Sequence, residues 1–360
     1  MKLAKILRGI PNKREYLARA LGGLGVLGLL ERTAAAWRPG LVVLTYHRIA
    51  DPGADPFYDP VISATPESFR AQVEWLSNHV RLLTLHELIA QVQTGSPWRE
   101  PAAFLTFDDG YRDNFDAAVP ILGERNIPAT FFIPTAFLES PRLPWWDHVA
   151  YVVKQTRMRR LTLARNSGAG RGAPPLVIDL ETMPRTVGIR TIVRAFLDDT
   201  IADEQWFLEQ LRERAEVDVD HDGLGRALFM TWDQVRALAD SDAGLTIGSH
   251  AHGHHKLAGL DDESQRNELA GSKRILEDRL GREIMALAYP YGWPGTYTAS
   301  TKAFAAEAGY CLAFTSREGV NRPSTLDRYE VSRLGVGSGD SPALLRARTA
   351  LHAAFGASFL

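Results

Sequence analysis

Two acidic residues, Asp108 and Asp109, stand side by side and are followed by Gly110. Successive side chains of a regular strand point to opposite faces, but a turn at Gly110 would let both carboxylates approach one site. Two carboxylates held close together repel each other unless a cation neutralises one of them. The pattern therefore indicates a cation site, although an ordinary Asp-Asp-Gly turn that caps a following helix would have the same sequence.

Four histidines fall within six residues of a later segment: His250, His252, His254 and His255. His250 and His254 are four positions apart, which places both on one face if the chain turns helically there. Imidazole suits Zn²⁺ and other late divalent metals, and one carboxylate with two histidines leaves coordination positions open for water and substrate. We expect His252 and His255 to point elsewhere. A solvated histidine-rich loop is the alternative interpretation.

Residues 288–292 (Ala-Tyr-Pro-Tyr-Gly) end another apolar run. Proline restricts the backbone there and glycine frees it, so the N–H of Tyr291 could face a pocket as a donor to an oxyanion. An ordinary strand-to-loop turn explains the same residues. Elsewhere, Trp145 and Trp146 precede Asp147, which is compatible with a sugar-stacking subsite or with buried aromatic packing.

The segments with chemistry follow short apolar runs that we predict to be buried strands. These runs are residues 41–47, 103–107, 129–133, 245–249, 286–289 and 311–315. Helical patterns lie between them, at residues 114–124, 232–239, 263–280 and 298–308, and a further helix opens at Thr65 and Pro66. Strands that alternate with helices predict parallel βα units. The polar residues follow the strands, where (β/α) barrels carry their chemistry.

Residues 138–229 break this alternation. They contain a segment rich in glycine and proline at 166–175 and two predicted helices at 187–198 and 203–216. We interpret them as a mostly helical insertion over the mouth of a barrel that spans residues 41–340. Residues 1–40 then form a separate N-terminal segment, and residues 341–360 a C-terminal helix.

The composition is that of a globular protein, with 45% apolar and 23% charged residues in a chain of 360. The formal net charge of −2 gives no electrostatic reason to expect nucleic acid as a partner. Cys311 is the one cysteine, so no intrachain disulfide can form. This is compatible with a cytoplasmic location.

The N-terminal segment begins with six basic residues among its first nineteen and continues with an apolar run at residues 21–30. That run is too short to span a bilayer, which needs about 20 residues. We favour a packed or membrane-surface helix over an export signal or anchor. Peripheral membrane contact through this segment is therefore expected, with export as the alternative.

Taken together, the three segments resemble the polysaccharide deacetylase family, carbohydrate esterase family four, whose shared unit is the NodB homology domain. The family's motifs are similar to residues 106–110, 249–254 and 288–292, and the resemblance extends to residues 44–48 and 230–233. It covers about residues 41–336 apart from the insertion. It implies a distorted (β/α)7 barrel that binds a divalent metal, preferably Zn²⁺, through Asp109, His250 and His254.

The resemblance also implies an activity, which is removal of an N-acetyl group from an N-acetylated carbohydrate. Asp108 would be the catalytic base that deprotonates the attacking water, and the Tyr291 N–H would stabilise the oxyanion. Two alternatives stay open. One is a sugar-binding barrel that has lost turnover, and the other is an amidohydrolase of a small C–N substrate.

Three departures from the family pattern concern groups around the metal. Ala251 stands where the family often has Ser or Thr, and Ala288 stands where it often has an Arg that orients the base. The late Leu-x-His motif that usually supplies the acid is absent from residues 332–336. Such losses resemble a branch of the family associated with surface-polysaccharide synthesis.

The proton for the leaving amine must then come from another group. His47 is the first side-chain candidate, because it ends the strand that begins at residue 41, on the catalytic face of a barrel. The alternative is that His47 only braces the barrel rim through hydrogen bonds. His148 is the second, if the insertion folds over the pocket. Otherwise Asp108 returns the proton that it accepted.

Overall fold

The computed structural model describes residues 13–29, 40–165, 173–198, 201, 203–241 and 243–355. The chain divides into two compact units. The barrel unit comprises the described residues of 1–51, 61–139 and 229–360, and the inserted unit those of 52–60 and 140–228. The sequence did not indicate that residues 52–60 belong with the inserted unit.

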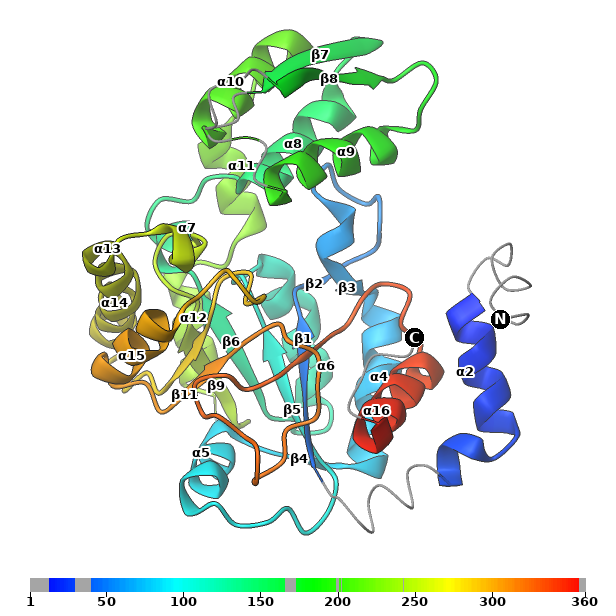
Figure 1. The fold of residues 1–360 in the computed structure, drawn as a ribbon, viewed down its shortest axis with the longest axis vertical. Coiled ribbons are helices and arrows are strands. Elements are labelled where there is room, and N and C mark those ends of the chain that lie inside the picture. The colour runs from blue at the N-terminus through cyan, green and yellow to red at the C-terminus, as the bar shows by residue number, and fades with distance from the viewer. Residues whose placement is uncertain are drawn as a thin grey trace. The chain divides into compact units, whose positions relative to one another are not determined.

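In the described part of the chain, seven strands of the barrel unit follow one another in the order β11-β10-β9-β6-β5-β1-β12, and β4 pairs with β5 off this path. Figure 1 labels β1, β4, β5, β6, β9 and β11 of this sheet. Every pair in this sheet is parallel. Their bounds are β1 (Leu41–Tyr46), β4 (Arg81–Leu82), β5 (Ala102–Phe107), β6 (Ala129–Ile133), β9 (Leu245–Ser249), β10 (Ala286–Ala288), β11 (Leu312–Phe314) and β12 (Leu334–Gly335).

The segment that leads into β12 joins the two ends of this path. Val331 donates its N–H to Ala313 and accepts from Thr315, so it pairs with β11. Three residues later, Leu334 pairs with Leu44 of β1. The curled parallel sheet thus closes into the distorted (β/α)7 barrel that the sequence predicted.

The central strands are mostly apolar, as expected for strands that are buried on both faces. In β1, Val42, Leu44 and Tyr46 contact a cluster shared with the surrounding helices, whereas Leu41 and Val43 belong to a second cluster. That second cluster includes stacked rings from strands far apart in the sheet order, such as Phe104 and Phe314 at 5.7 Å. It is therefore the interior of the barrel, and buried residues of α5 (Leu85–Thr94) join it.

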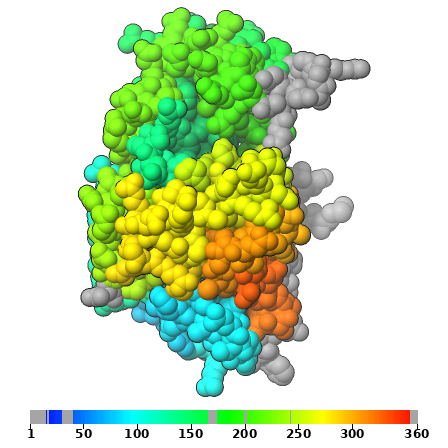
Figure 2. Space-filling model, turned by 90° about the vertical axis from the view of Figure 1, so that its left-hand side faces the viewer, coloured from blue at the N-terminus to red at the C-terminus, as the bar shows by residue number. Residues whose placement is uncertain are grey.

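The predicted helices surround this sheet. The helix at Thr65 begins as expected, with the Thr65 side chain accepting from the Ser68 N–H and Pro66 in the first turn. Figure 2 shows α13 to α15 (yellow to orange) and α5 (cyan) together on one face of the unit. The helical elements of the barrel unit are α2 (Lys13–Gly23), α4 (Pro66–His79), α5, η3 (Asn114–Ala118), α6 (Val119–Gly123), α7 (Thr135–Glu139), α12 (Trp232–Ala239), η4 (Leu257–Gly259), α13 (Asp262–Arg266), η5 (Asn267–Gly271), α14 (Ser272–Leu280), α15 (Ala299–Glu307) and α16 (Pro342–Phe355).

In its described residues, the inserted unit contains the two predicted helices and two more. It contains α8 (Trp145–Gln155), α9 (Arg185–Leu197), α10 (Glu204–Ala215) and α11 (His221–Leu228), but also an antiparallel pair, β7 (Arg160–Arg165) and β8 (Ala173–Asp179). Part of the predicted loop at 166–175 therefore belongs to a strand. Its two prolines, Pro174 and Pro175, argue against a strand, but both strands of a two-stranded sheet are edges, where proline is tolerated.

Trp145 and Trp146 are buried within α8, and the Trp145 ring stacks on Phe196 at 4.6 Å. Their role is therefore aromatic packing inside the inserted unit. Neither ring is presented to solvent as a sugar subsite would require.

The N-terminal segment is described from residue 13 to residue 29, and its remaining residues lie outside the described ranges. In it, Ala18 and Leu27 pack against Leu344, Ala347 and Ala350 of α16. Among the described residues, no helix has the length and apolar character needed to cross a membrane. Contact of this segment with a membrane surface stays a prediction.

Candidate metal and catalytic site

Asp108 and Asp109 follow β5, and the turn that brings them together begins one residue earlier than expected. Asp109 itself has a φ of 72°, and Gly110 continues with 66°. Because a left-handed aspartate breaks the alternation of the strand, its carboxylate need not point away from that of Asp108. Both side chains are buried at the carboxyl end of the barrel strand.

His250 and His254 come together through a loop and not through the helical turn that their spacing suggested. The chain after β9 is irregular, and Ala251 and His254 have positive φ values of 60° and 57°. Glu268 stabilises this loop by accepting from the N–H groups of residues 252 and 253 at 2.9 and 2.7 Å. The centres of the two imidazole rings lie 4.9 Å apart.

Asp109, His250 and His254 form a compact group whose potential ligand atoms all lie within 4.8 Å of one another. Asp109 Oδ1 lies 3.4 Å from His250 Nε2 and 3.2 Å from His254 Nε2. It is a buried carboxylate oxygen without a hydrogen-bonding partner of good geometry. No other group of three such residues occurs in the part of the chain that the structure describes.

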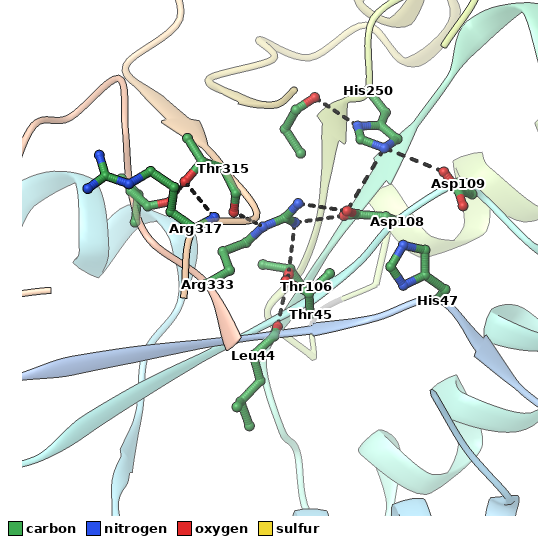
Figure 3. Close-up of polar contacts among 12 residues, drawn as sticks. Leu44, Thr45, His47, Thr106, Asp108, Asp109, His250, Thr315, Arg317 and Arg333 are labelled. Atoms are coloured by element: carbon green, nitrogen blue, oxygen red, sulfur yellow. Dashed lines mark hydrogen bonds and ion pairs between the residues drawn. The ribbon is translucent and has the colours of Figure 1, made fainter. Parts of the chain in front are cut away.

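The tautomer of His250 suits a metal ligand. Its Nδ1 lies 2.7 Å from the carbonyl oxygen of Ala288, which can only accept, so Nδ1 carries the proton (Figure 3). The lone pair of Nε2 then faces the carboxylates. A backbone carbonyl that orients a ligating imidazole in this way is a common feature of metal sites. The donors therefore fit a late divalent cation such as Zn²⁺.

Arg333 holds Asp108 in a bidentate pair. Its two terminal nitrogens donate to Oδ1 and Oδ2 of Asp108, both at 2.8 Å (Figure 3). Its Nε donates to the carbonyl of Thr315 at 2.9 Å, and its side chain is 1% exposed. The guanidinium is thus fixed on both sides, and it fixes Asp108 in turn.

Arg333 also corrects the sequence analysis. Ala288 stands where the family often has an arginine, but Arg333 orients Asp108 from the segment that closes the barrel. Residues 332–336 lack the histidine of the family's late motif, but they contain this arginine. Its position one residue before the apolar Leu334 in a predicted barrel region was the available signal.

The two aspartates are electrostatically distinct. Burial raises the pKa of Asp108, but Arg333 and the nearby His250 and His47 lower it by a larger amount. The pKa of Asp108 is therefore below its usual value. Burial also raises the pKa of Asp109, yet its contacts with His250 and His254 hold that pKa well below its usual range. Both groups are therefore ionised at neutral pH, as a ligand and a base must be.

The two remaining predicted residues lie beside this group. His47 follows β1, its N–H donates to Ser63 Oγ and its carbonyl accepts from Asn114, and Figure 3 shows its ring beside Asp108 and Asp109. Tyr291 has a φ of 61°, and its ring lies 5.0 Å from that of His254. The roles of His47 as acid and of the Tyr291 N–H as oxyanion donor stay predictions.

His148 and His252 have different surroundings. His148 is buried within α8 of the inserted unit, where its ring contacts that of His221 at 4.8 Å. His252 interacts through Nδ1 with the hydroxyl of Thr135 at 2.8 Å. The group of ligands around Asp109 includes neither of them.

The family model of the polysaccharide deacetylases matches residues 96–164 and 196–313, just over half of the chain. This range contains the two aspartates, the histidine segment and Tyr291, but neither His47 nor Arg333. The match therefore rests on the same three segments that the geometry brings together.

Two similar proteins carry related names. The Bacillus subtilis (strain 168) protein YxkH, whose name places it among the polysaccharide deacetylases, is 20% identical over 78% of this chain and 65% of its own length. A poly-β-1,6-N-acetyl-D-glucosamine N-deacetylase of Staphylococcus epidermidis is 31% identical over 28% of this chain and 37% of its own length. The chain thus spans less than two thirds of either relative.

Among solved structures, the Streptococcus pyogenes deacetylase PplD in complex with acetate is similar with a TM-score of 0.55. The two chains are 18% identical, and the similarity covers 85% of this chain and 96% of PplD. At that identity the likeness concerns the fold, and it agrees with the barrel described above.

Proposed function

Because the chain belongs to the polysaccharide deacetylase family, we propose that it hydrolyses N-acetyl groups on the amino sugars of a polysaccharide or a glycan precursor. The observation that carries the proposal is the division of labour between two adjacent carboxylates. Asp109 faces the two imidazoles, and Asp108 is oriented by Arg333. Such a division suits a hydrolase that needs one ligand and one base.

A polymer of N-acetylglucosamine is the first substrate class that we propose. The Staphylococcus epidermidis relative is named as an N-deacetylase of the β-1,6-linked polymer. Its similarity spans 28% of this chain, so the linkage and the length of the substrate are open to test.

Asp109, His250 and His254 would hold a divalent cation, which supplies Lewis-acid polarisation of the acetyl carbonyl and lowers the pKa of water when it is bound. Asp108 accepts the proton of the attacking water. Its carboxylate is available for this at neutral pH because Arg333 keeps its pKa low. The N–H of Tyr291 donates to the oxygen that gains charge as the carbonyl is attacked.

The same low pKa makes protonated Asp108 a strong acid. Once Asp108 has accepted a proton, Arg333 favours its release, and the amine nitrogen of the leaving sugar is the natural acceptor. We therefore propose that Asp108 serves as both base and acid, with His47 as the alternative donor. Because the fixed guanidinium favours return of the proton from Asp108 to the amine, this chain does not need the late histidine motif as its acid.

Release of acetate from defined substrates tests the proposal. The purified chain is incubated with β-1,6- and β-1,4-linked N-acetylglucosamine oligomers and with a small aryl acetamide, before and after treatment with a chelator. We expect acetate from an oligomer, loss of release on chelation and recovery on addition of Zn²⁺ or another late divalent metal.

Two other outcomes would overturn this function. Release from the small acetamide alone would identify an amidohydrolase of small substrates. Binding of oligomers without acetate release under any metal condition would identify a sugar-binding barrel.

A further inference from the structure

Trp293 is an exposed aromatic side chain that the catalytic account does not use. It is 45% exposed, and it follows directly after the segment that contains Tyr291. In residues 243–355 it is the only large hydrophobic side chain in the described structure that is exposed. One exposed indole beside the candidate site offers a single aromatic face, which is large enough to contact one unit of a small ligand but too small for a protein interface.

A row of rings connects this indole to the metal ligands. The ring of His254 lies 5.0 Å from that of Tyr291, and the ring of Tyr291 lies 6.0 Å from that of Trp293. Exposure increases along the row, from buried His254 through half-buried Tyr291 to exposed Trp293. The row therefore leads from the reaction site to solvent.

The loop that carries the indole is firmly anchored. Gly292 has a φ of 65°, and its carbonyl accepts from the Ser316 N–H at 2.8 Å. The carbonyl of Trp293 accepts from both the N–H and the hydroxyl of Thr296, at 3.0 and 2.8 Å. Thr296 in turn accepts from the N–H of Ala258, in the segment that follows the histidines. The backbone around Trp293 is thus tied to the same loop that positions His254.

The backbone conformation next to Trp293 is costly. Tyr291 adopts a φ of 61°, which a bulky side chain rarely does outside a functional constraint. This conformation places the Tyr291 ring between His254 and Trp293, and the ammonium of Lys256 lies 5.9 Å from its centre. The strained backbone of Tyr291 therefore holds the row of rings in place at the edge of the site.

We propose that Trp293 is a sugar-binding platform that stacks on a unit of the glycan next to the unit that loses its acetyl group. The C–H groups on one face of a pyranose carry partial positive charge, and the face of an indole is negative, so the two surfaces attract each other in water. An anchored indole also loses little conformational entropy when the ligand binds. This inference rests on the proposed function and adds a preference for oligomers over single sugars.

The experiment compares Trp293→Ala with wild type on the N-acetylglucosamine monosaccharide and on the pentasaccharide that releases most acetate. We expect KM for the pentasaccharide to rise about tenfold, as for loss of one aromatic stacking contact, with kcat and metal content unchanged. Activity on the monosaccharide should not change. Trp293→Phe should restore most of the affinity, and Trp206→Ala, which removes an indole that is 39% exposed in the inserted unit, is the matched control.

Binding is also measured directly, by titration of the β-1,6-linked and the β-1,4-linked N-acetylglucosamine pentasaccharides into Asp108→Asn with and without Trp293→Ala. This arm does not depend on turnover, so an inactive wild type would refute the proposed function and still leave the platform under test. An unchanged affinity for both pentasaccharides in the titration, or an equal loss for monosaccharide and pentasaccharide in the assay, would overturn the proposal.

Discussion

The molecule contains two pairs of neighbouring histidines with almost the same ring separation and opposite surroundings. In the barrel unit the rings of His250 and His254 are 4.9 Å apart, and in the inserted unit those of His148 and His221 are 4.8 Å apart. The barrel pair shares the Oδ1 atom of Asp109. Among the described residues, no carboxylate lies within ion-pair distance of the His148 ring, and both of its nitrogens are buried without hydrogen bonds.

The pKa values of these histidines differ because the charged groups around them differ. Burial, His221 and Arg212 lower the pKa of His148 to about 4. The His148 imidazole is therefore neutral at pH 7. Burial also acts on the barrel pair and lowers the pKa of His254, but at His250 Asp108 and Asp109 outweigh burial and raise the pKa. The barrel pair therefore faces a carboxylate whose charge favours a cation, whereas the His148 ring has no such neighbour within ion-pair distance among the described residues.

Replacing the base should separate chemistry from binding in the barrel unit. Asp108→Asn removes the proton acceptor and keeps the shape of the side chain, so we expect kcat to fall by about 10²- to 10⁴-fold. Metal content should stay at the wild-type level. Acetate release and metal analysis are measured on the same preparations, with the exposed Asp116→Asn as control. Turnover near that of wild type would mean that the attacking water needs no help from Asp108.

Arg333 should be the next most sensitive position. Arg333→Lys keeps one positive charge but loses the bidentate geometry, and we expect kcat to fall about 10- to 100-fold. The pKa of Asp108 should rise, so the acid limb of the kcat/KM profile should move to higher pH. Arg348→Lys, which alters another arginine–aspartate pair of the barrel unit, is the control. An unmoved acid limb would show that Arg333 does not set the ionisation of Asp108.

His47 lies beside the carboxylates, and its replacement decides between the two proton donors. If Asp108 returns the proton, His47→Ala should reduce turnover by less than about tenfold and leave the alkaline limb of kcat/KM in place, since general-acid catalysis is worth more than that. The pH profile of acetate release is the measurement. Loss of the alkaline limb with intact metal content would instead assign the acid role to His47.

The histidine pair of the inserted unit should affect stability and not catalysis. A histidine whose pKa is lowered on folding contributes stability above the unfolded pKa of about 6.5, and this stability is lost as the pH falls toward 4. We expect His148 to account for a decrease of about 2–3 kcal/mol in the free energy of unfolding between pH 7 and pH 4. In His148→Phe, chemical denaturation should show a correspondingly smaller decrease. An identical pH dependence in both proteins would mean that His148 is not held neutral.

The sequence predicted the strands and the three polar segments because each depends on local chemistry. A buried parallel strand is a continuous apolar run, and the aspartates and histidines follow such runs directly. The conformations within the segments were less accessible. His250 and His254 meet through left-handed residues at 251 and 254, which no spacing rule for helices anticipates.

Arg333 and Trp293 were missed for different reasons. Arg333 contacts Asp108 across 225 residues of chain, and that contact exists only because the barrel closes between β11 and β1. Trp293 follows the third segment by one residue, but sequence alone does not distinguish an exposed indole from the buried Trp145 and Trp146. Burial is a tertiary property, so the sequence left both a sugar subsite and aromatic packing open for Trp145 and Trp146, and their burial favours packing.

The central claim is that Asp109, His250 and His254 bind one divalent cation, and metal titration tests it most directly. Zn²⁺ is titrated into metal-free wild type, Asp109→Ala, His254→Ala, the double variant and His148→Phe, and the bound metal is quantified after dialysis. The account predicts one tightly bound ion per chain in wild type and in His148→Phe, with affinity reduced more than about 100-fold in each ligand variant. Full occupancy in the Asp109→Ala/His254→Ala double variant would contradict it.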